Sequence, residues 1–81
     1  MDYKITYRRQ PEKFLDNQPQ SVRMRIMNAA EKLPSVGDIS PLEGRDGFRL
    51  RVGTYRVLFK VDHVARTVDV VAIGNRGDVY K

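Results

Sequence analysis

The sequence predicts an α+β fold of the order β-α-α-β-β-β, in which a twisted antiparallel sheet packs on an N-terminal helical hairpin. Two observations indicate this class. Apolar residues recur at helical spacing only before residue 34, whereas from Phe48 onward they alternate with polar residues, as in a sheet with one buried face. Because the chain has 81 residues, both patterns have to contribute to one core, so residues 1–81 are expected to form a single domain.

The N-terminal part is predicted to contain one strand and two helices. Residues 2–7, DYKITY, alternate between apolar and polar side chains, which favours a strand. Pro11 and Glu12 are typical of a first helical turn, and this helix is expected to end near Asn17. Pro19 then begins a second helix, which Pro34 ends. The apolar face of the second helix is formed by Val22, Ile26, Ala29 or Ala30, and Leu33.

The C-terminal part is predicted to form three strands. Residues 34–47 are rich in proline, glycine and serine, which indicates a loop. Strands then follow at 48–52, 55–61 and 67–73, with residues 62–66 as a turn. Gly53 and Thr54 suit a two-residue hairpin turn of type II′ or I′, because glycine adopts positive φ without strain.

The polar side of the predicted hairpin carries cations: Arg49, Arg51, Arg56 and Lys60. A turn at residues 53–54 places Arg51 opposite Arg56, with Cβ atoms about 5 Å apart, and like charges in such a pair are destabilising. The fold does not need this pair. One interpretation is that both guanidinium groups share an anion, and the alternative is an ordinary solvated face whose long side chains separate in water.

Composition limits the classes of partner. The chain has 15 Lys and Arg against 10 Asp and Glu, a net charge of +5, which permits nucleic acid or an acidic protein as partner. Cysteine is absent, which fits a protein of the reducing cytoplasm, so a cytoplasmic location is expected. Because His63 is also the one histidine, a zinc site would lack ligands. No segment is apolar enough for a signal peptide or a membrane span. We expect no metal, cofactor or membrane partner.

The sequence contains few residues that are suited to conventional catalysis of hydrolysis. The sequence has no phosphate-binding loop of the GxxxxGK type, and its serines have no evident base. RNA, however, brings its own nucleophile in the 2′-OH, and fixed cations are able to align the strand and stabilise charge on the phosphoryl oxygens. Arginine cannot take the proton. A base would have to be Tyr80, Lys60 or water.

Two motifs carry a resemblance to a known family. The block LEGRDGFRLRVGTYRV and the closing G-x-R-x-D-V-Y resemble the RelE/ParE superfamily of toxins from type II toxin–antitoxin modules, in the RelE-like branch, and the order of elements agrees over essentially the whole chain. The resemblance implies a RelE-like fold and a ribosome-dependent mRNA endonuclease, an mRNA interferase that inhibits translation. It also implies a cognate acidic antitoxin as partner, beside the ribosome and mRNA.

The resemblance also implies site residues. The basic residues of the sheet fall on Arg49, Arg51 and Arg56, and a C-terminal arginine and tyrosine fall on Arg76 and Tyr80. The catalytic set implied is Arg51, Arg56, Arg76 and Tyr80. The predicted RNA-binding set is Arg49, Arg51, Arg56 and Arg76 together with Lys60, which the charge pattern of the hairpin adds. The chain departs from the family where arginines replace two hairpin lysines and where Asn75 replaces a frequent histidine, so two candidate bases are missing.

Two alternative functions remain open. ParE-like relatives share the fold and inhibit DNA gyrase without cleaving RNA, and a toxin-fold remnant or a plain RNA-binding module would have no activity. Leu58, an apolar residue between Arg56 and Lys60, is predicted to contact the antitoxin. The alternative for Leu58 is a packed residue under the C-terminal segment.

Overall fold

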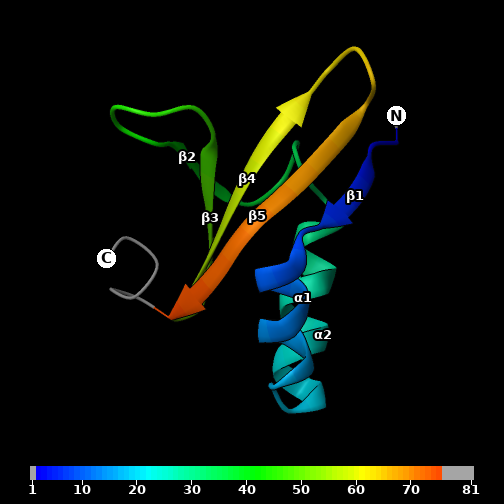
Figure 1. The fold of residues 1–81 in the computed structure, drawn as a ribbon, viewed down its shortest axis with the longest axis vertical. Helices are drawn as coiled ribbons and strands as arrows, with labels where there is room; N and C mark the ends of the chain where they lie inside the picture. Colours follow the sequence, from blue (N-terminus) through cyan, green and yellow to red (C-terminus); the bar gives the residue numbers. More distant parts are fainter. Residues whose placement is uncertain (1, 76–81) are drawn as a thin grey trace.

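The protein, for which a computed structural model is described here over residues 2–75, contains two helices and five strands in this range (Figure 1). In chain order they are β1 (Lys4–Tyr7), α1 (Arg9–Asp16), α2 (Gln20–Ala30), β2 (Asp38–Pro41), β3 (Phe48–Val52), β4 (Tyr55–Asp62) and β5 (Thr67–Asn75). The α+β class and the helical hairpin ahead of the sheet are therefore confirmed. Arg76 and Tyr80 lie outside the described residues.

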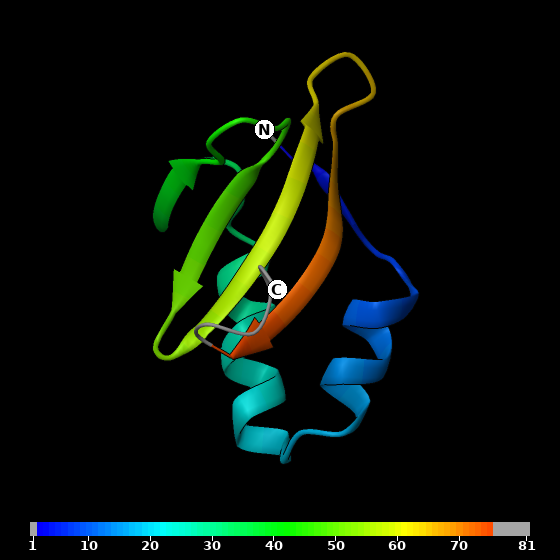
Figure 2. The same cartoon turned by 60° about the vertical axis from the view of Figure 1, so that its left-hand side comes forward.

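The five strands form one sheet in the order β1-β5-β4-β3-β2, and Figure 2 shows them side by side. The chain from β2 to β5 is an antiparallel meander, of which the part from β3 to β5 was predicted. Strand β1 instead pairs with β5 in parallel, from Lys4 opposite Thr67 to Tyr7 opposite Val70. The expectation of a wholly antiparallel sheet is corrected here. No tight turn joins β1 to β5, so chain connectivity does not impose an antiparallel pairing on them.

Strand β2 corrects the prediction that residues 34–47 are all loop. Asp38 to Pro41 pair with β3 at the edge of the sheet, with Asp38 opposite Arg51 and Ser40 opposite Arg49. Proline is tolerated in such an edge strand because its missing N–H is not needed on the solvent side. The turn-forming composition of the segment therefore concealed a short strand.

The two helices begin and end close to the predicted positions. Helix α1 begins two residues before Pro11 and ends at Asp16, beside the expected Asn17. Helix α2 follows Pro19 but ends at Ala30, before the last predicted apolar position, Leu33. After Ala30 the backbone changes to bonds between residues three apart, such as Leu33 N–H to the Ala30 carbonyl at 3.1 Å. Leu33 remains buried nonetheless.

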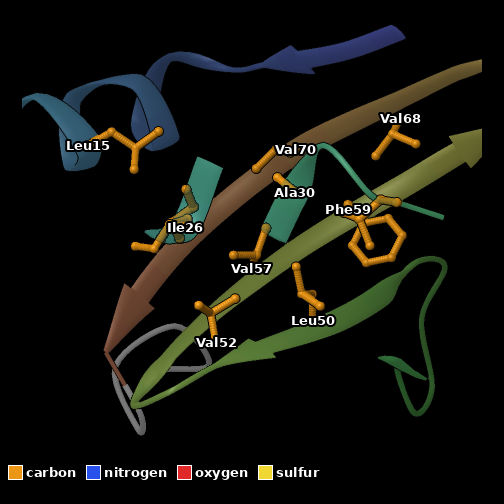
Figure 3. Packing of buried hydrophobic residues seen from close by; sticks show 11 residues of the cluster. Leu15, Ile26, Ala30, Leu50, Val52, Val57, Phe59, Val68 and Val70 are labelled. Atoms are coloured by element: carbon orange, nitrogen blue, oxygen red, sulfur yellow. The ribbon is translucent and has the colours of Figure 1, made fainter. Parts of the chain in front are cut away.

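The core lies between the helical hairpin and one face of the sheet (Figure 3). The helices contribute Leu15, Ile26 and Ala30, and the strands contribute Leu50, Val52, Val57, Phe59, Val68, Val70 and Ile73. Each large apolar side chain that is fully buried stabilises the fold by about 1.5–3 kcal/mol. The predicted one-sided burial of the hairpin is thus confirmed, and its polar side faces away from the helices.

Strand β5 contains an irregularity that fits it to this core. Leu58 pairs with Ala72 and Phe59 with Val70, so Val71 is the extra residue of a β-bulge. The bulge allows Val70 and Ile73 to face the core although they are three residues apart.

Helix α1 also binds the free backbone of β5 beyond the end of β1. The Gln10 side chain donates from Nε2 to the Ile73 carbonyl and accepts from the Ile73 N–H through Oε1, both at 2.8 Å. These two bonds replace a strand neighbour at this position.

Half-burial of Tyr7 on β1 raises the pKa of its hydroxyl, and the Glu31 carboxylate adds to the increase.

Candidate nucleic-acid interface

The turn between β3 and β4 determines which cations meet on the open face, the side of the sheet away from the helices. Gly53 has φ +59°, and Arg66 is the only described residue other than glycine with positive φ. The turn is therefore of type II′, since type I′ needs positive φ at Thr54 as well. With this turn, Val52 pairs with Tyr55 and Arg51 with Arg56, as the sequence predicted.

Three arginines share the open face. Leu50 and Val57, a cross-strand pair, face the core and are 1% and 0% exposed. Because successive side chains of a strand point to opposite faces, the flanking Arg49, Arg51 and Arg56 face away from the core. We call these three residues the arginine face. Their placement on one side of two adjacent strands agrees with the prediction from periodicity.

Arg49 is held against the sheet. Its Nη2 donates a hydrogen bond of 2.8 Å to Ser40 Oγ on β2, which shows that Ser40 also lies on the open face. Its Nε is buried and has no hydrogen-bond partner among the described residues. An unsatisfied buried donor costs about 1–3 kcal/mol. An anion that reached Nε would remove that cost.

A hollow of about 450 Å³ opens beside Arg49. It is lined by Ser40, Pro41, Leu42, Glu43, Arg45 and Arg49. The hollow brings a further cation, Arg45, to the edge of the arginine face. On the helix side, Arg25 of α2 reaches the β3–β4 turn, because a Cβ added at Gly53 would lie 3.2 Å from Arg25 Nη1. Neither Arg25 nor Arg45 was singled out from the sequence, since nothing in their local patterns relates them to the hairpin.

Two residues of the arginine face, Arg49 and Arg51, form no ion pair within the described chain. The one ion pair found within residues 2–75 joins Arg8 Nη2 to Asp69 Oδ2 at 2.7 Å. No carboxylate in this range forms an ion pair with Arg49 or Arg51, although Asp38 is the cross-strand neighbour of Arg51. An approaching anion would therefore meet the guanidinium groups of Arg49 and Arg51, which form no ion pair with the described part of the chain.

Lys60 lies toward the other end of the open face, where most of the neighbouring charged side chains are acidic. Its cross-strand partner is Asp69, which accepts hydrogen bonds from Arg8 Nε at 2.9 Å and from Thr6 Oγ1 at 3.3 Å. A second hollow of about 450 Å³ lies here. It is lined by Thr6, Asp46, Lys60, Val61, Asp62, Thr67 and Asp69, and we call it the acidic hollow. The sequence showed Lys60 in line with the arginines but not its acidic surroundings.

Leu58 lies between these two ends and is 1% exposed. It pairs with Arg49 on one side and with Ala72 on the other, so it faces away from the main core. Its burial agrees with the packing alternative. The predicted antitoxin contact at Leu58 stays a prediction, and it requires that the side chain be uncovered when the partner binds.

Of the remaining candidate positions, His63 lies apart from the arginine face. His63 is in the turn after β4, where its Nδ1 lies 2.7 Å from the Tyr3 hydroxyl, in agreement with a surface role. Arg76 and Tyr80, predicted to complete the site, are beyond the described residues. Strand β5 ends at Asn75 opposite Tyr55, one pair beyond Arg56 and Gly74.

Within the described range, no helix has the length and apolar character needed to cross a membrane.

Comparisons with known proteins address the fold. No family model matches the chain, and no curated protein matches its sequence. Among solved structures, the archaeal RelE-RelB complex of Pyrococcus horikoshii OT3 contains a chain that matches with a TM-score of 0.77 and 26% identity, over 98% of this chain and 100% of that chain. A chain of the RelBE2 toxin-antitoxin complex of Mycobacterium tuberculosis matches with a TM-score of 0.76 and 23% identity, over 94% and 100%.

A third match is to the RelB-RelE antitoxin-toxin complex of Methanococcus jannaschii, with a TM-score of 0.72 and 24% identity, over 93% of this chain and 94% of that chain. The likeness extends over whole chains on both sides. The RelE-like fold expected from the two sequence motifs is therefore confirmed, and with it the resemblance to the RelE toxins.

Proposed function

We propose that this chain, RelE-like in fold, is the toxin of a type II toxin–antitoxin module and an mRNA endonuclease that acts on the ribosome and inhibits translation. The observation that carries the proposal is the pairing of Arg51 with Arg56 across the hairpin, with Arg49 on the same open face. A pair of like charges that the fold does not need has a reason if a polyanion lies over it. The fold shared with RelE chains supports the same function.

In this mechanism the arginine face holds one stretch of RNA backbone. Arg51 and Arg56 contact the scissile phosphate, and their charge stabilises the negative charge that grows on its oxygens in the transition state. Arg49, fixed by Ser40, contacts a neighbouring phosphate. The RNA supplies the nucleophile through its 2′-OH, so the protein acts chiefly by alignment and electrostatics.

The C-terminal residues take the roles that the family resemblance implies. Arg76 adds a further cation at the phosphate, and Tyr80 stacks on a base or assists proton transfer. Lys60 contributes a weaker backbone contact, because Asp69 opposes it. The proposal assigns no metal or cofactor to the site.

The proposed partner is a small acidic antitoxin that is encoded beside the toxin. Both proteins would act in the cytoplasm. The matched RelE chains were solved in complexes with RelB, which makes an antitoxin partner reasonable for this chain. An acidic segment is attracted by the same arginine face that would bind RNA. Antitoxin and RNA would then compete for one surface.

Growth and mRNA cleavage test the proposal together. We would express the chain, Arg51→Ala, Arg56→Ala and the control Arg9→Ala, which removes an exposed arginine of α1 away from the arginine face. The expected result is growth arrest and primer-extension stops on translated mRNA for the wild type and Arg9→Ala. The two hairpin variants should lose both while remaining folded, which denaturation curves check.

Two outcomes would contradict the proposal. Growth arrest that is unchanged in both Arg51→Ala and Arg56→Ala would remove the arginine face from the mechanism. Intact transcripts accompanied by cleaved DNA complexes would indicate a gyrase inhibitor instead.

A further inference from the structure

The arginine face lacks a group that accepts a proton. Attack by the 2′-OH requires that its proton leave, and a guanidinium group does not take it, since it stays charged in proteins. The acceptor is therefore another side chain near Arg51 and Arg56, or water. Carboxylates are the first candidates, because they are ionised at neutral pH and accept hydrogen bonds.

Asp38 is the carboxylate that the sheet places beside the arginine pair. It is the cross-strand partner of Arg51, which in turn is the partner of Arg56. These three residues therefore form one row across β2, β3 and β4. Adjacent strands are about 4.8 Å apart, so the Asp38 carboxylate is one strand from Arg51 and two strands from Arg56.

The side of the sheet on which Asp38 lies follows from its neighbours. Ile39 packs against the hydrophobic core, so Asp38 and Ser40 project from the opposite face. The hydrogen bond from Arg49 to Ser40 confirms that this is the face that carries the arginines. Asp38 is exposed, and within residues 2–75 its side chain forms no hydrogen bond or ion pair.

Two other carboxylates are less well placed. Asp69 is bound by Arg8 and Thr6, and it lies in the acidic hollow on the far side of β4. Glu43 lines the hollow beside Arg49, in the loop after β2, together with Arg45. Neither is in register with Arg51 and Arg56, and Glu43 is not held on a strand.

We propose that Asp38 is the general base of the proposed ribonuclease reaction. This inference rests on the proposed function and names a residue for the proton transfer that the arginines cannot perform. With the scissile phosphate over Arg51 and Arg56, the ribose on its 5′ side lies toward β2, where a carboxylate oxygen of Asp38 accepts the 2′-OH proton. The required distance is a hydrogen bond of about 2.6–3.2 Å in the bound state.

The step balances without any added reactant. The bond from O2′ to phosphorus forms and the bond from phosphorus to O5′ breaks. The electron pair of the broken bond goes to O5′, which takes a proton from water, while Asp38 keeps the proton of the 2′-OH until it returns it to solvent. The products are a 2′,3′-cyclic phosphate and a 5′-hydroxyl end. The RNA accordingly crosses the sheet with its 5′ side at β2.

Arg51 makes Asp38 suitable for this role. It is the charged residue that faces Asp38 from β3, the strand that pairs with β2. The Arg51 guanidinium at this position links the Asp38 carboxylate to the phosphate that Arg51 is proposed to contact. Asp38 would thus orient Arg51 as well as accept the proton, so a test has to separate binding from proton transfer.

The experiment is single-turnover cleavage of ribosome-bound mRNA between pH 5 and pH 8, with RNA binding measured in parallel. The variants are Asp38→Asn, Asp38→Glu, and the matched controls Asp69→Asn and Glu43→Gln. We expect Asp38→Asn to slow cleavage by roughly 100-fold or more at pH 7 without weakening RNA binding. The controls should cleave at the rate of the wild type, and Asp38→Glu should recover part of the loss.

The pH profile distinguishes a base from a merely structural residue. The wild-type rate should change little from pH 5 to pH 8, because Asp38 rather than hydroxide removes the proton. The rate of Asp38→Asn should instead rise nearly tenfold for each pH unit, since hydroxide then has to remove the proton. Denaturation curves and antitoxin binding show whether each variant is folded.

Each contrary result has a separate meaning. Cleavage by Asp38→Asn at the wild-type rate, or a loss that appears in Glu43→Gln instead, would overturn the assignment of Asp38 and leave the nuclease proposal in place. Absence of cleavage by the wild type on a translated mRNA would overturn both.

Discussion

The two ends of the open face differ in how the same kind of cation is used. At the end near the β3–β4 turn, Arg51 faces Arg56, and no carboxylate in the described range forms an ion pair with Arg49 or Arg51. At the other end, Lys60 faces Asp69, which Arg8 already binds, and carboxylates surround the acidic hollow. The comparison teaches that the carboxylates gathered around a cation, here Asp46, Asp62 and Asp69 beside Lys60, decide how strongly a position attracts an anion.

The turn that creates the arginine pair is the place where this difference is easiest to break. Gly53→Ala should lower the free energy of unfolding by about 1–2 kcal/mol, because a residue with a side chain is strained at φ +59°. The added Cβ would also lie 3.2 Å from Arg25 Nη1. Urea denaturation measures the loss, and RNA binding should weaken in the same variant.

A control for this prediction is Gly44→Ala. Gly44 also has positive φ, +71°, but nothing lies within 4 Å of an added Cβ. It should destabilise the protein less than Gly53→Ala and leave RNA binding unchanged. Equal stability of Gly53→Ala and the wild type would show that the turn does not hold Arg51 and Arg56 in register.

Substitutions at the two ends should change stability in opposite directions. Arg51→Thr relieves the pair of like charges and introduces a residue that favours strands, so it should stabilise the fold by about 0.2–1 kcal/mol. Asp69→Asn removes the negative charge that Arg8 binds and should destabilise the fold by less than about 1 kcal/mol, since the pair is partly exposed. Chemical denaturation at low and high salt checks both.

High salt should reduce both effects, because screening weakens charge interactions near the surface. A change of the same sign at the two ends would contradict the comparison.

Much of the fold was predictable from local pattern. The alternation through Phe48–Val52 and Tyr55–Asp62, with a glycine between them, determined the hairpin register and therefore the opposition of Arg51 and Arg56. The helical hairpin was likewise visible from its prolines and apolar spacing. These features depend on neighbours close in the sequence, which periodicity reports well.

The features that were not predicted depend on contacts between distant segments. Strand β2 lies in a segment whose prolines and glycines indicate a loop, and the alternation of Asp38, Ile39 and Ser40 was too short to outweigh them. The parallel pairing of β1 with β5 and the approach of Arg25 to the turn leave no local pattern at all. As a result, the sequence identified the arginines of the proposed site but not Asp38 beside them.

The salt dependence of RNA binding tests the central claim most directly. Each phosphate that a cation contacts on single-stranded RNA contributes about 0.7 to the slope of log affinity against log salt concentration. Arg51→Ala should reduce that slope by about 0.7. Lys60→Ala should change it much less. An equal or larger reduction in Lys60→Ala would contradict the assignment of the arginine end as the surface that binds RNA.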